Sequence, residues 1–202
     1  LDEIVVLLVT KNPSKQEILN FCKDLNKFRE NIFIPITVGG GIRTFEDAKI
    51  YFEYGADKII INHLAHKNHK EVELISKNFG SQAISVMIDY KKIKNKYISF
   101  SDAASINSYE IKEFFKILSK LNFGELILNS IDRDGTGFGF DKKILEIVPN
   151  QYIHPILLMG GAGKPEHFEQ VLKKEKVSGA ITANLFNFLG SGLELSRNHC
   201  IK

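Results

Sequence analysis

Short apolar runs alternate with longer amphipathic runs along the chain. The short runs carry Ile, Val and Leu at successive positions, so both of their faces are apolar, as in parallel strands that are buried on both sides. Seven such strands are predicted: Ile4–Val9, Ile36–Val38, Lys58–Asn62, Ala83–Asp89, Glu125–Ile131, Pro155–Met159 and Gly179–Ala183.

The runs between these strands have helical periodicity. Examples are "SKQEILNFCKDLNKF", "TFEDAKIYFEYG" and "PEHFEQVLKKE". Ser14, Thr44 and Lys164-Pro165 stand where helix starts are expected. The short run Ile98–Phe100 is assigned to a hairpin in the loop after the strand that ends at Asp89. Regular alternation of strand and helix predicts an α/β fold with a parallel sheet.

An internal repeat favours a closed barrel over an open sheet. "GGGIRTFEDAKIYFEYGADKIIIN" and "GGAGKPEHFEQVLKKEKVSGAITAN" both have the order glycine turn, helix, strand, Asn. About four βα units of ~30 residues separate the two copies. This spacing predicts a (βα)8 TIM barrel of the usual ~250 residues. We therefore expect residues 1–202 to form a single TIM-barrel domain that lacks its first βα unit and is incomplete at the amino terminus.

Composition narrows the classes of function. The chain is 44% hydrophobic, which is enough for one sizeable core. A net charge of +3 with no basic stripe argues against nucleic acid, and no apolar run reaches the ~20 residues of a membrane span. Cys22 and Cys200 have no disulfide or metal spacing, which fits the cytoplasm. His63, His66 and His69 would drift around a helix rather than converge, so we expect neither a metal nor another cofactor.

Glycine clusters follow two of the predicted strands and precede helices. One is Gly39–Gly41, and the other begins with Gly160 and Gly161. Backbone N–H groups that no side chain shields can approach an anion, and the helix dipole favours negative charge there. A tight turn that binds nothing is the alternative explanation for a single cluster. Two clusters half a barrel apart predict two phosphate sites that face each other across the barrel mouth and suit a ligand with a phosphate at each end.

Four motifs, in sequence order, carry a resemblance to one enzyme family. They are "PITVGGGIRTFEDAKIYFEYGADKIIIN", "GSQAISVMIDYKK", "GELILNSIDRDGTGFGFD" and "MGGAGKPEHFEQVL". Together they resemble the cyclase subunit of imidazole glycerol phosphate synthase, from histidine biosynthesis, from about Asp2 to Phe186. The resemblance implies a TIM barrel and a bisphosphate substrate, a phosphoribulosyl-formimino aminoimidazole carboxamide ribonucleotide. Addition of ammonia would convert this substrate to imidazole glycerol phosphate and aminoimidazole carboxamide ribonucleotide.

The resemblance also implies roles for residues at the strand ends. Of the family's two catalytic aspartates, one would lie in the missing first strand, and the other matches Asp89. A helix cap or turn is the alternative role for Asp89. The residues implied to bind substrate and its phosphates are Gly40, Gly41, Asn62, His63, Asp134, Gly135, Gly160, Gly161, Ala183 and Asn184.

Charged residues begin three of the apolar strands. They are Glu3 in "EIVVL", Lys58 in "KIIIN" and Glu125 in "ELILN". Solvated strand starts are the ordinary explanation. The resemblance instead implies a charged gate on the barrel floor, through which ammonia enters, with Asp57 at the interface to the partner. The implied partner is a class I glutaminase, which would form a heterodimer with this chain.

Three residues depart from the family pattern on the substrate face. Leu8 stands in place of Asp, Met159 in place of Ser and His63 in place of Thr. These changes, and the ending "TANLFNFLGSGLELSRN", keep a paralogous function open: an ammonia-using subunit of glutamine-dependent sugar amidation in surface-polysaccharide biosynthesis. A non-catalytic barrel that scaffolds a glutaminase is the third alternative. The retention of Asp89 and of both glycine clusters favours the cyclase.

Overall fold

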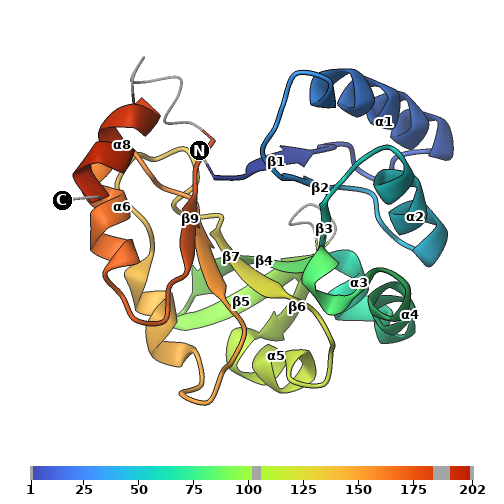
Figure 1. Ribbon diagram of the computed structural model, residues 1–202. Helices are drawn as coiled ribbons and strands as arrows, with labels where there is room; N and C mark the ends of the chain where they lie inside the picture. Colours follow the sequence, from blue (N-terminus) through green and yellow to red (C-terminus); the bar gives the residue numbers. More distant parts are fainter. Residues whose placement is uncertain (1, 102–105, 184–191, 201–202) are drawn as a thin grey trace. The chain divides into compact units, whose positions relative to one another are not determined.

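The computed structural model describes residues 2–101, 106–183 and 192–200 (Figure 1). Its helices and strands follow in chain order: β1 (Ile4–Leu7), α1 (Lys15–Arg29), β2 (Ile36–Gly39), α2 (Phe45–Glu53), β3 (Lys58–Ile61), α3 (His63–Lys67), α4 (His69–Phe79), η1 (Ser81–Ala83), β4 (Ile84–Ile93), β5 (Lys96–Ser101), β6 (Ile106–Glu110), α5 (Ile111–Leu118), β7 (Glu125–Ser130), η2 (Lys142–Ile147), β8 (Ile156–Met159), α6 (Pro165–Leu172), β9 (Gly179–Ile181) and α8 (Gly192–Cys200).

The chain divides into two compact units. Of the described residues, unit 1 comprises 2–86, 101, 106 and 120–124, and unit 2 comprises 87–100, 107–119, 125–183 and 192–200. Strand β4 begins in unit 1 and continues in unit 2.

Unit 1 is built on parallel strands in the order β1-β2-β3-β4. Residues 36–39 of β2 and 59–61 of β3 are buried at every position, as expected for strands that are covered on both faces. Helices α1 and α2 begin at Ser14 and Thr44, and each of these side chains accepts a hydrogen bond from the backbone N–H of an acidic residue three positions on. The acidic residue returns the bond, so both helices start with a capping box. The predicted helix starts at Ser14 and Thr44 are confirmed.

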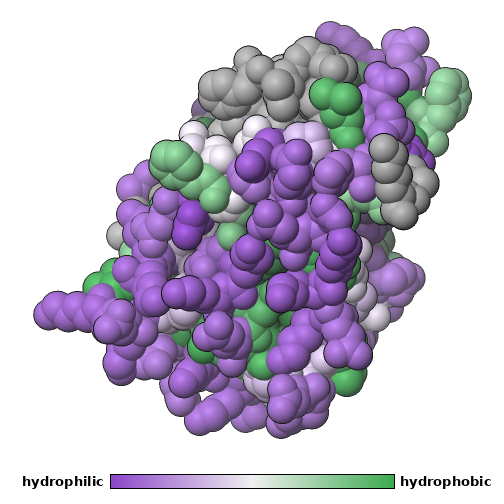
Figure 2. Space-filling model, turned by 90° about the vertical axis from the view of Figure 1, so that its left-hand side faces the viewer, coloured by the Kyte–Doolittle hydropathy of each residue, from purple (hydrophilic) through white to green (hydrophobic). Residues whose placement is uncertain are grey.

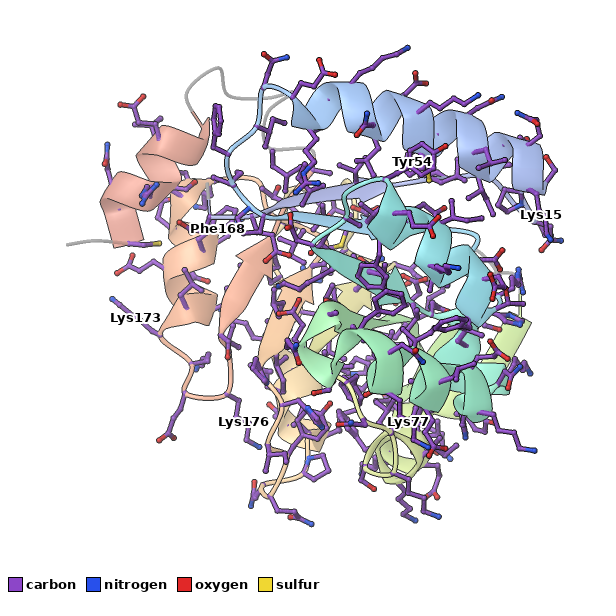
Figure 3. The ribbon with its side chains drawn as sticks, turned by 45° about the vertical axis from the view of Figure 1, so that its right-hand side comes forward. Lys15, Tyr54, Lys77, Phe168, Lys173 and Lys176 are labelled. Atoms are coloured by element: carbon purple, nitrogen blue, oxygen red, sulfur yellow. The ribbon has the colours of Figure 1, made fainter. Side chains whose placement is uncertain are left out.

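Unit 2 continues with β7, β8 and β9, which are parallel to one another and follow β4 in strand order. Helices α6 and α8 lie side by side (Figure 1). The buried ring of Phe168 on α6 packs edge to face against Phe140, with ring centroids 5.5 Å apart, whereas Lys173, just beyond the helix, is exposed (Figure 3). Helix α6 starts with Pro165 in its first turn, as predicted.

The hairpin after β4 corrects one sequence-based prediction. Strand β4 was expected to end at Asp89, but it continues to Ile93 and pairs with β5 in antiparallel register, with Asp89 opposite Phe100. The predicted hairpin strand around Ile98–Phe100 is confirmed, although β5 is longer and β6, which pairs with it, was not predicted. Asp89 therefore stands where the parallel pairing of β4 gives way to the hairpin, rather than at the end of the strand.

The α/β fold class is confirmed. All seven predicted sheet strands are present, with ends that shift by one or two residues apart from the extension of β4. Their parallel order, with helices between them, agrees with a TIM-barrel type of fold. The single incomplete domain and the missing first βα unit stay predictions.

The surface is largely hydrophilic on the face drawn in Figure 2, where hydrophobic residues form small separate areas. No helix in the described part of the chain is long and apolar enough to cross a membrane.

Candidate active site

A small pocket in unit 2 gathers five of the predicted site residues. Its lining consists of Asp134, Gly135, Met159, Gly160, Gly161, Ala162, Ile181, Thr182 and Ala183. These residues come from the loops that follow β7, β8 and β9, because the carboxyl ends of parallel strands open on the same edge of a sheet. Asn184, which was predicted to contribute here, lies outside the described residues.

The glycines of this pocket are needed for close backbone contacts. Gly161 has a φ of +100°, and a Cβ on it would stand 2.4 Å from the carbonyl oxygen of Gly139, whose own N–H donates to Gly161 O at 2.7 Å. A Cβ on Gly160 would stand 2.7 Å from the carbonyl oxygen of Ser130. The loops after β7 and β8 therefore pack backbone against backbone. This packing requires glycine whether or not an anion binds, so phosphate binding stays a prediction.

Asp89 and Asn129 form a hydrogen-bonded pair beside this pocket. Asn129 Nδ2 donates to Asp89 Oδ1 at 2.7 Å. Asn129 is paired in register with Met159, which lines the pocket, and the point where a Cβ on Gly160 would stand is 3.4 Å from Asn129 Oδ1. The predicted catalytic aspartate thus adjoins the predicted phosphate loop within one unit.

The pKa of Asp89 is raised above its ordinary value. The main cause is burial, which disfavours the charged form, and the negative charge of Asp134 acts in the same direction. The hydrogen bond from Asn129 opposes this rise because it favours the carboxylate. A carboxyl group whose pKa is raised keeps its proton to a higher pH, which suits it to both accepting and donating a proton.

The glycine loop of unit 1 is also held by backbone contacts. Gly40 has a φ of +105°, and a Cβ on it would stand 2.2 Å from the carbonyl oxygen of Leu8, at the end of β1. Gly41 has a φ of +69°, and a Cβ on it would stand 2.4 Å from the ring of Pro13. The hydroxyl group of Tyr51, a residue of α2, donates to Gly40 O at 2.7 Å and holds this turn in place.

Arg43 connects the three strand-to-helix loops of unit 1. Its Nη1 lies 2.6 Å from His63 Nδ1, and its Nη2 donates to Asn12 Oδ1 at 2.8 Å. Because a guanidinium group can only donate, His63 Nδ1 is the acceptor in this contact. Asn62 lies next to His63, at the end of β3.

Two of the three predicted gate residues form a salt bridge in unit 1. Lys58 Nζ lies 2.7 Å from Glu3 Oε2, both side chains are about one quarter exposed, and the Thr37 hydroxyl donates to the same carboxylate. Glu125 begins β7 in unit 2, as predicted. The Asp57 carboxylate accepts a hydrogen bond from Ile36 N at 2.8 Å, so Asp57 has a structural task at the start of β2. A closed ring of gate residues and a partner-facing role for Asp57 stay predictions.

The histidines at residues 63–69 have separate partners. Besides the contact of His63 with Arg43, His66 Nδ1 lies 2.9 Å from Asn62 O, and His69 Nε2 lies 3.0 Å from Ala65 O. Across the described ranges, no group of three or more His, Cys, Asp or Glu residues is placed to hold a metal ion.

Sequence reasoning did not identify Asn129 and Arg43 as site residues. Asn129 follows an apolar run in "ELILNS", and Arg43 follows the glycines in "GGGIR". Both stand at carboxyl ends of strands or in the loops after them, which is the one signal that identifies such residues in this fold.

Comparison with known proteins identifies the family. A family model described as "Histidine biosynthesis protein" matches residues 1–190. A protein of Parasynechococcus marenigrum, provisionally named imidazole glycerol phosphate synthase subunit hisF2, is 40% identical over 198 residues, which are 98% of this chain and 73% of the relative. The imidazole glycerol phosphate synthase subunits HisF of Sulfurisphaera tokodaii and Hydrogenobaculum sp. are 39% and 37% identical, over 92% and 93% of this chain and 74% of each relative.

These matches confirm the resemblance inferred from the four motifs, and they cover both units. The chain belongs to the histidine-biosynthesis protein family and, within it, to the HisF-type cyclase subunits of imidazole glycerol phosphate synthase.

Proposed function

We propose that this chain uses ammonia to convert a phosphoribulosyl-formimino aminoimidazole carboxamide ribonucleotide to imidazole glycerol phosphate and aminoimidazole carboxamide ribonucleotide. The observation that carries this proposal is the Asp89–Asn129 pair, which adjoins the pocket formed by Asp134, Gly160 and Gly161. Asp89 is the general acid–base of this reaction, because ring closure and cleavage require protons to be moved and the pKa of this carboxyl group is raised.

The two glycine loops bind the two phosphate groups of the substrate. In unit 2 the backbone around Gly160 and Gly161 lines a pocket, and in unit 1 the Gly40–Gly41 turn precedes Arg43, whose guanidinium group lies 2.6 Å from His63 Nδ1.

The source of ammonia is a glutaminase partner that docks at the amino ends of the strands. Glu3 and Lys58 hold each other at the amino ends of β1 and β3, where an uncharged ammonia molecule would enter. Because the two charges compensate each other and Thr37 satisfies a further carboxylate lone pair, the pair persists without a bound ligand.

Replacing Lys58 by Met is expected to uncouple glutamine hydrolysis by the partner from the use of ammonia by this chain. With a glutaminase partner and glutamine as the nitrogen source, turnover should fall by at least about tenfold, which corresponds to a loss of 1.4 kcal/mol in coupling. With free ammonium salt it should stay near that of the wild type. The control is Lys77→Met, which removes an exposed lysine paired with Glu73 on α4 (Figure 3). Equal losses with both nitrogen sources would contradict a gating role for Lys58.

Two apolar residues favour a second candidate function. Leu8 follows β1 beside the Gly40 turn, and Met159 lines the pocket of unit 2, where the family pattern has an Asp and a Ser. Neither side chain can donate a hydrogen bond to a phosphate group. An acceptor that carries fewer phosphate groups, such as a sugar that is amidated with the same ammonia, suits these residues better.

Turnover with ammonium salt separates these functions. The purified protein is incubated with the ribonucleotide and ammonium, and the release of aminoimidazole carboxamide ribonucleotide is followed. Product formation supports the cyclase. Binding of a sugar nucleotide without turnover of the ribonucleotide supports sugar amidation, and activation of a glutaminase with neither supports a scaffold.

A further inference from the structure

The side-chain amide of Asn129 has two polar atoms, and within the described part of the chain only one of them has a hydrogen-bond partner. Its Nδ2 donates to Asp89 at 2.7 Å, while its Oδ1 is buried and has no hydrogen-bond partner among residues 2–101, 106–183 and 192–200. A buried acceptor without a partner is unfavourable, because it has lost its hydrogen bond to water and gained none in return. Few of the described side-chain atoms are left in this condition.

The position of this atom relates it to the pocket. Asn129 Oδ1 lies 3.4 Å from the point where a Cβ on Gly160 would stand, and Gly160 forms part of the pocket wall. Because position 160 is a glycine, no side chain covers the oxygen from that direction. With Asp89 ionised, only Nδ2 can donate to its carboxylate, and this sets the orientation of the Asn129 amide.

We propose that Asn129 is both a positioning residue for Asp89 and a contact for the substrate. Its amide N–H fixes the Asp89 carboxyl group, and its carbonyl oxygen accepts a hydrogen bond from an N–H or O–H group of the bound substrate. The inference rests on the proposed function and adds that the substrate carries a hydrogen-bond donor next to the atoms that exchange protons with Asp89. A substrate analogue with an acceptor at that position would be excluded, because two acceptors would then face each other.

If Asn129 positions Asp89, loss of Asn129 should change the pKa of Asp89 in a known direction. The N–H of Asn129 favours the ionised form of Asp89, whereas burial and the charge of Asp134 oppose it. Removing the N–H should therefore raise the pKa of Asp89 further and move the acidic limb of the pH–rate profile to higher pH. A residue that only fills space would leave both unchanged.

Two variants of Asn129 test the proposal. Asn129→Leu keeps the size but removes both polar groups, and Asn129→Asp keeps an acceptor but replaces the donor by a second carboxylate. The pKa of Asp89 is measured by ¹³C NMR of its carboxyl carbon, in parallel with kcat and KM across pH. The control is Asn122→Leu, in which an asparagine that donates to Ser76 at 2.8 Å in unit 1 undergoes the same chemical change.

We expect the pKa of Asp89 to rise in Asn129→Leu and to rise further in Asn129→Asp, where two carboxyl groups share one site. The kcat value should fall about 10–100-fold in both variants, as is usual when a group that orients a reactive residue is lost. KM should rise about three- to tenfold in Asn129→Leu alone, because only this variant lacks the acceptor.

An unchanged pKa of Asp89 in Asn129→Leu would overturn the positioning role, and equal KM values in Asn129→Leu and Asn129→Asp would overturn the substrate contact. If the wild-type protein shows no turnover, the proposed function fails, and the NMR titration still decides whether Asn129 positions Asp89. If Asn129→Leu does not fold, Asn129→Ala supplies the same titration, because it also removes both polar groups without adding a charge.

Discussion

Replacing Asp89 by Asn is expected to lower turnover by about 10²–10⁴-fold, the usual contribution of a positioned acid–base group. The amide of the variant has nearly the same shape as the carboxyl group and can still accept the hydrogen bond from Asn129, which donates at 2.7 Å in the wild type. The variant therefore keeps the geometry of the pair and loses only the proton that can be exchanged.

The same variant is expected to melt at a higher temperature than the wild type at neutral pH. Because the folded-state pKa of Asp89 is raised, the folded protein binds this proton more tightly than the unfolded chain does. The ionisation of Asp89 therefore lowers the free energy of unfolding. This loss is absent below the unfolded-state pKa of about 3.9, grows until the pH passes the folded-state pKa, and is constant above it. Asn carries no charge at any pH, so its advantage should appear only above about pH 4.

Melting curves between pH 3 and pH 8 measure this difference, and ammonium-dependent turnover measures the loss of activity. Asp24→Asn is the control, because it makes the same chemical change at an exposed residue, whose carboxylate lies 3.5 Å from Lys27 on α1. A variant that retains more than about a tenth of the activity would rule out Asp89 as the acid–base group. A variant that is less stable than the wild type at pH 7 would show that the carboxylate is stabilising.

Replacing Gly161 by Ala is expected to destabilise the fold by about 2–4 kcal/mol, the range for a substitution that forces the backbone to move. The new methyl group would stand 2.4 Å from Gly139 O, and the residue would keep a φ of +100° that L-amino acids rarely adopt. The melting temperature should fall by roughly 5–15 °C in a chain of this size.

Gly137→Ala separates the steric clash from the backbone strain. Gly137 also has a positive φ, +70°, but a Cβ on it would have as its nearest neighbour Gly163 Cα at 3.8 Å, an ordinary contact. It should therefore cost only the left-handed backbone term of about 1–2 kcal/mol. Equal melting temperatures for the two variants would show that the loops after β7 and β8 are not packed as tightly as the backbone distances imply.

The seven sheet strands could be predicted because both of their faces are apolar. The hairpin of β4 and β5 could not be predicted in this way. The residues after Asp89 include three lysines, at positions 91, 92 and 94, so the segment has the composition of a loop. In the structure Lys91 and Lys92 lie over the rings of Phe100 and Tyr97, with the ammonium nitrogens 5.7 and 5.5 Å from the ring centroids. These cation–π contacts let a charged segment pair as a strand, and they depend on neighbours that hydrophobic periodicity does not reveal.

The turn of this hairpin carried a signal that was missed. Lys94 and Asn95 both have positive φ values, 46° and 65°, and they connect β4 to β5 as a two-residue loop. Such loops require residues that tolerate the left-handed conformation, and Asn does so more readily than most. Its neighbour Lys94 is not a usual residue for such a turn, so the loop was not recognised from the sequence.

The candidate site was predictable to the extent that topology determines it. Gly160 and Gly161 were identified because they follow a parallel strand and precede a helix, Asp134 was identified from the family resemblance, and the structure brings the three together in one pocket. Asn129 and Arg43 were missed because their importance comes from one partner each time, Asp89 at 2.7 Å and His63 at 2.6 Å, and a partner far along the chain cannot be read from local composition.

The close backbone approach at Gly40 and Gly161 changes how related sequences should be judged. A duplicated copy that had lost its catalytic activity would still have to keep these glycines in order to fold. Neutral drift would instead remove the polar side chains that have no role in folding. Within this family, a pseudoenzyme is therefore better recognised by what stands at positions 89 and 129 than by an intact glycine signature.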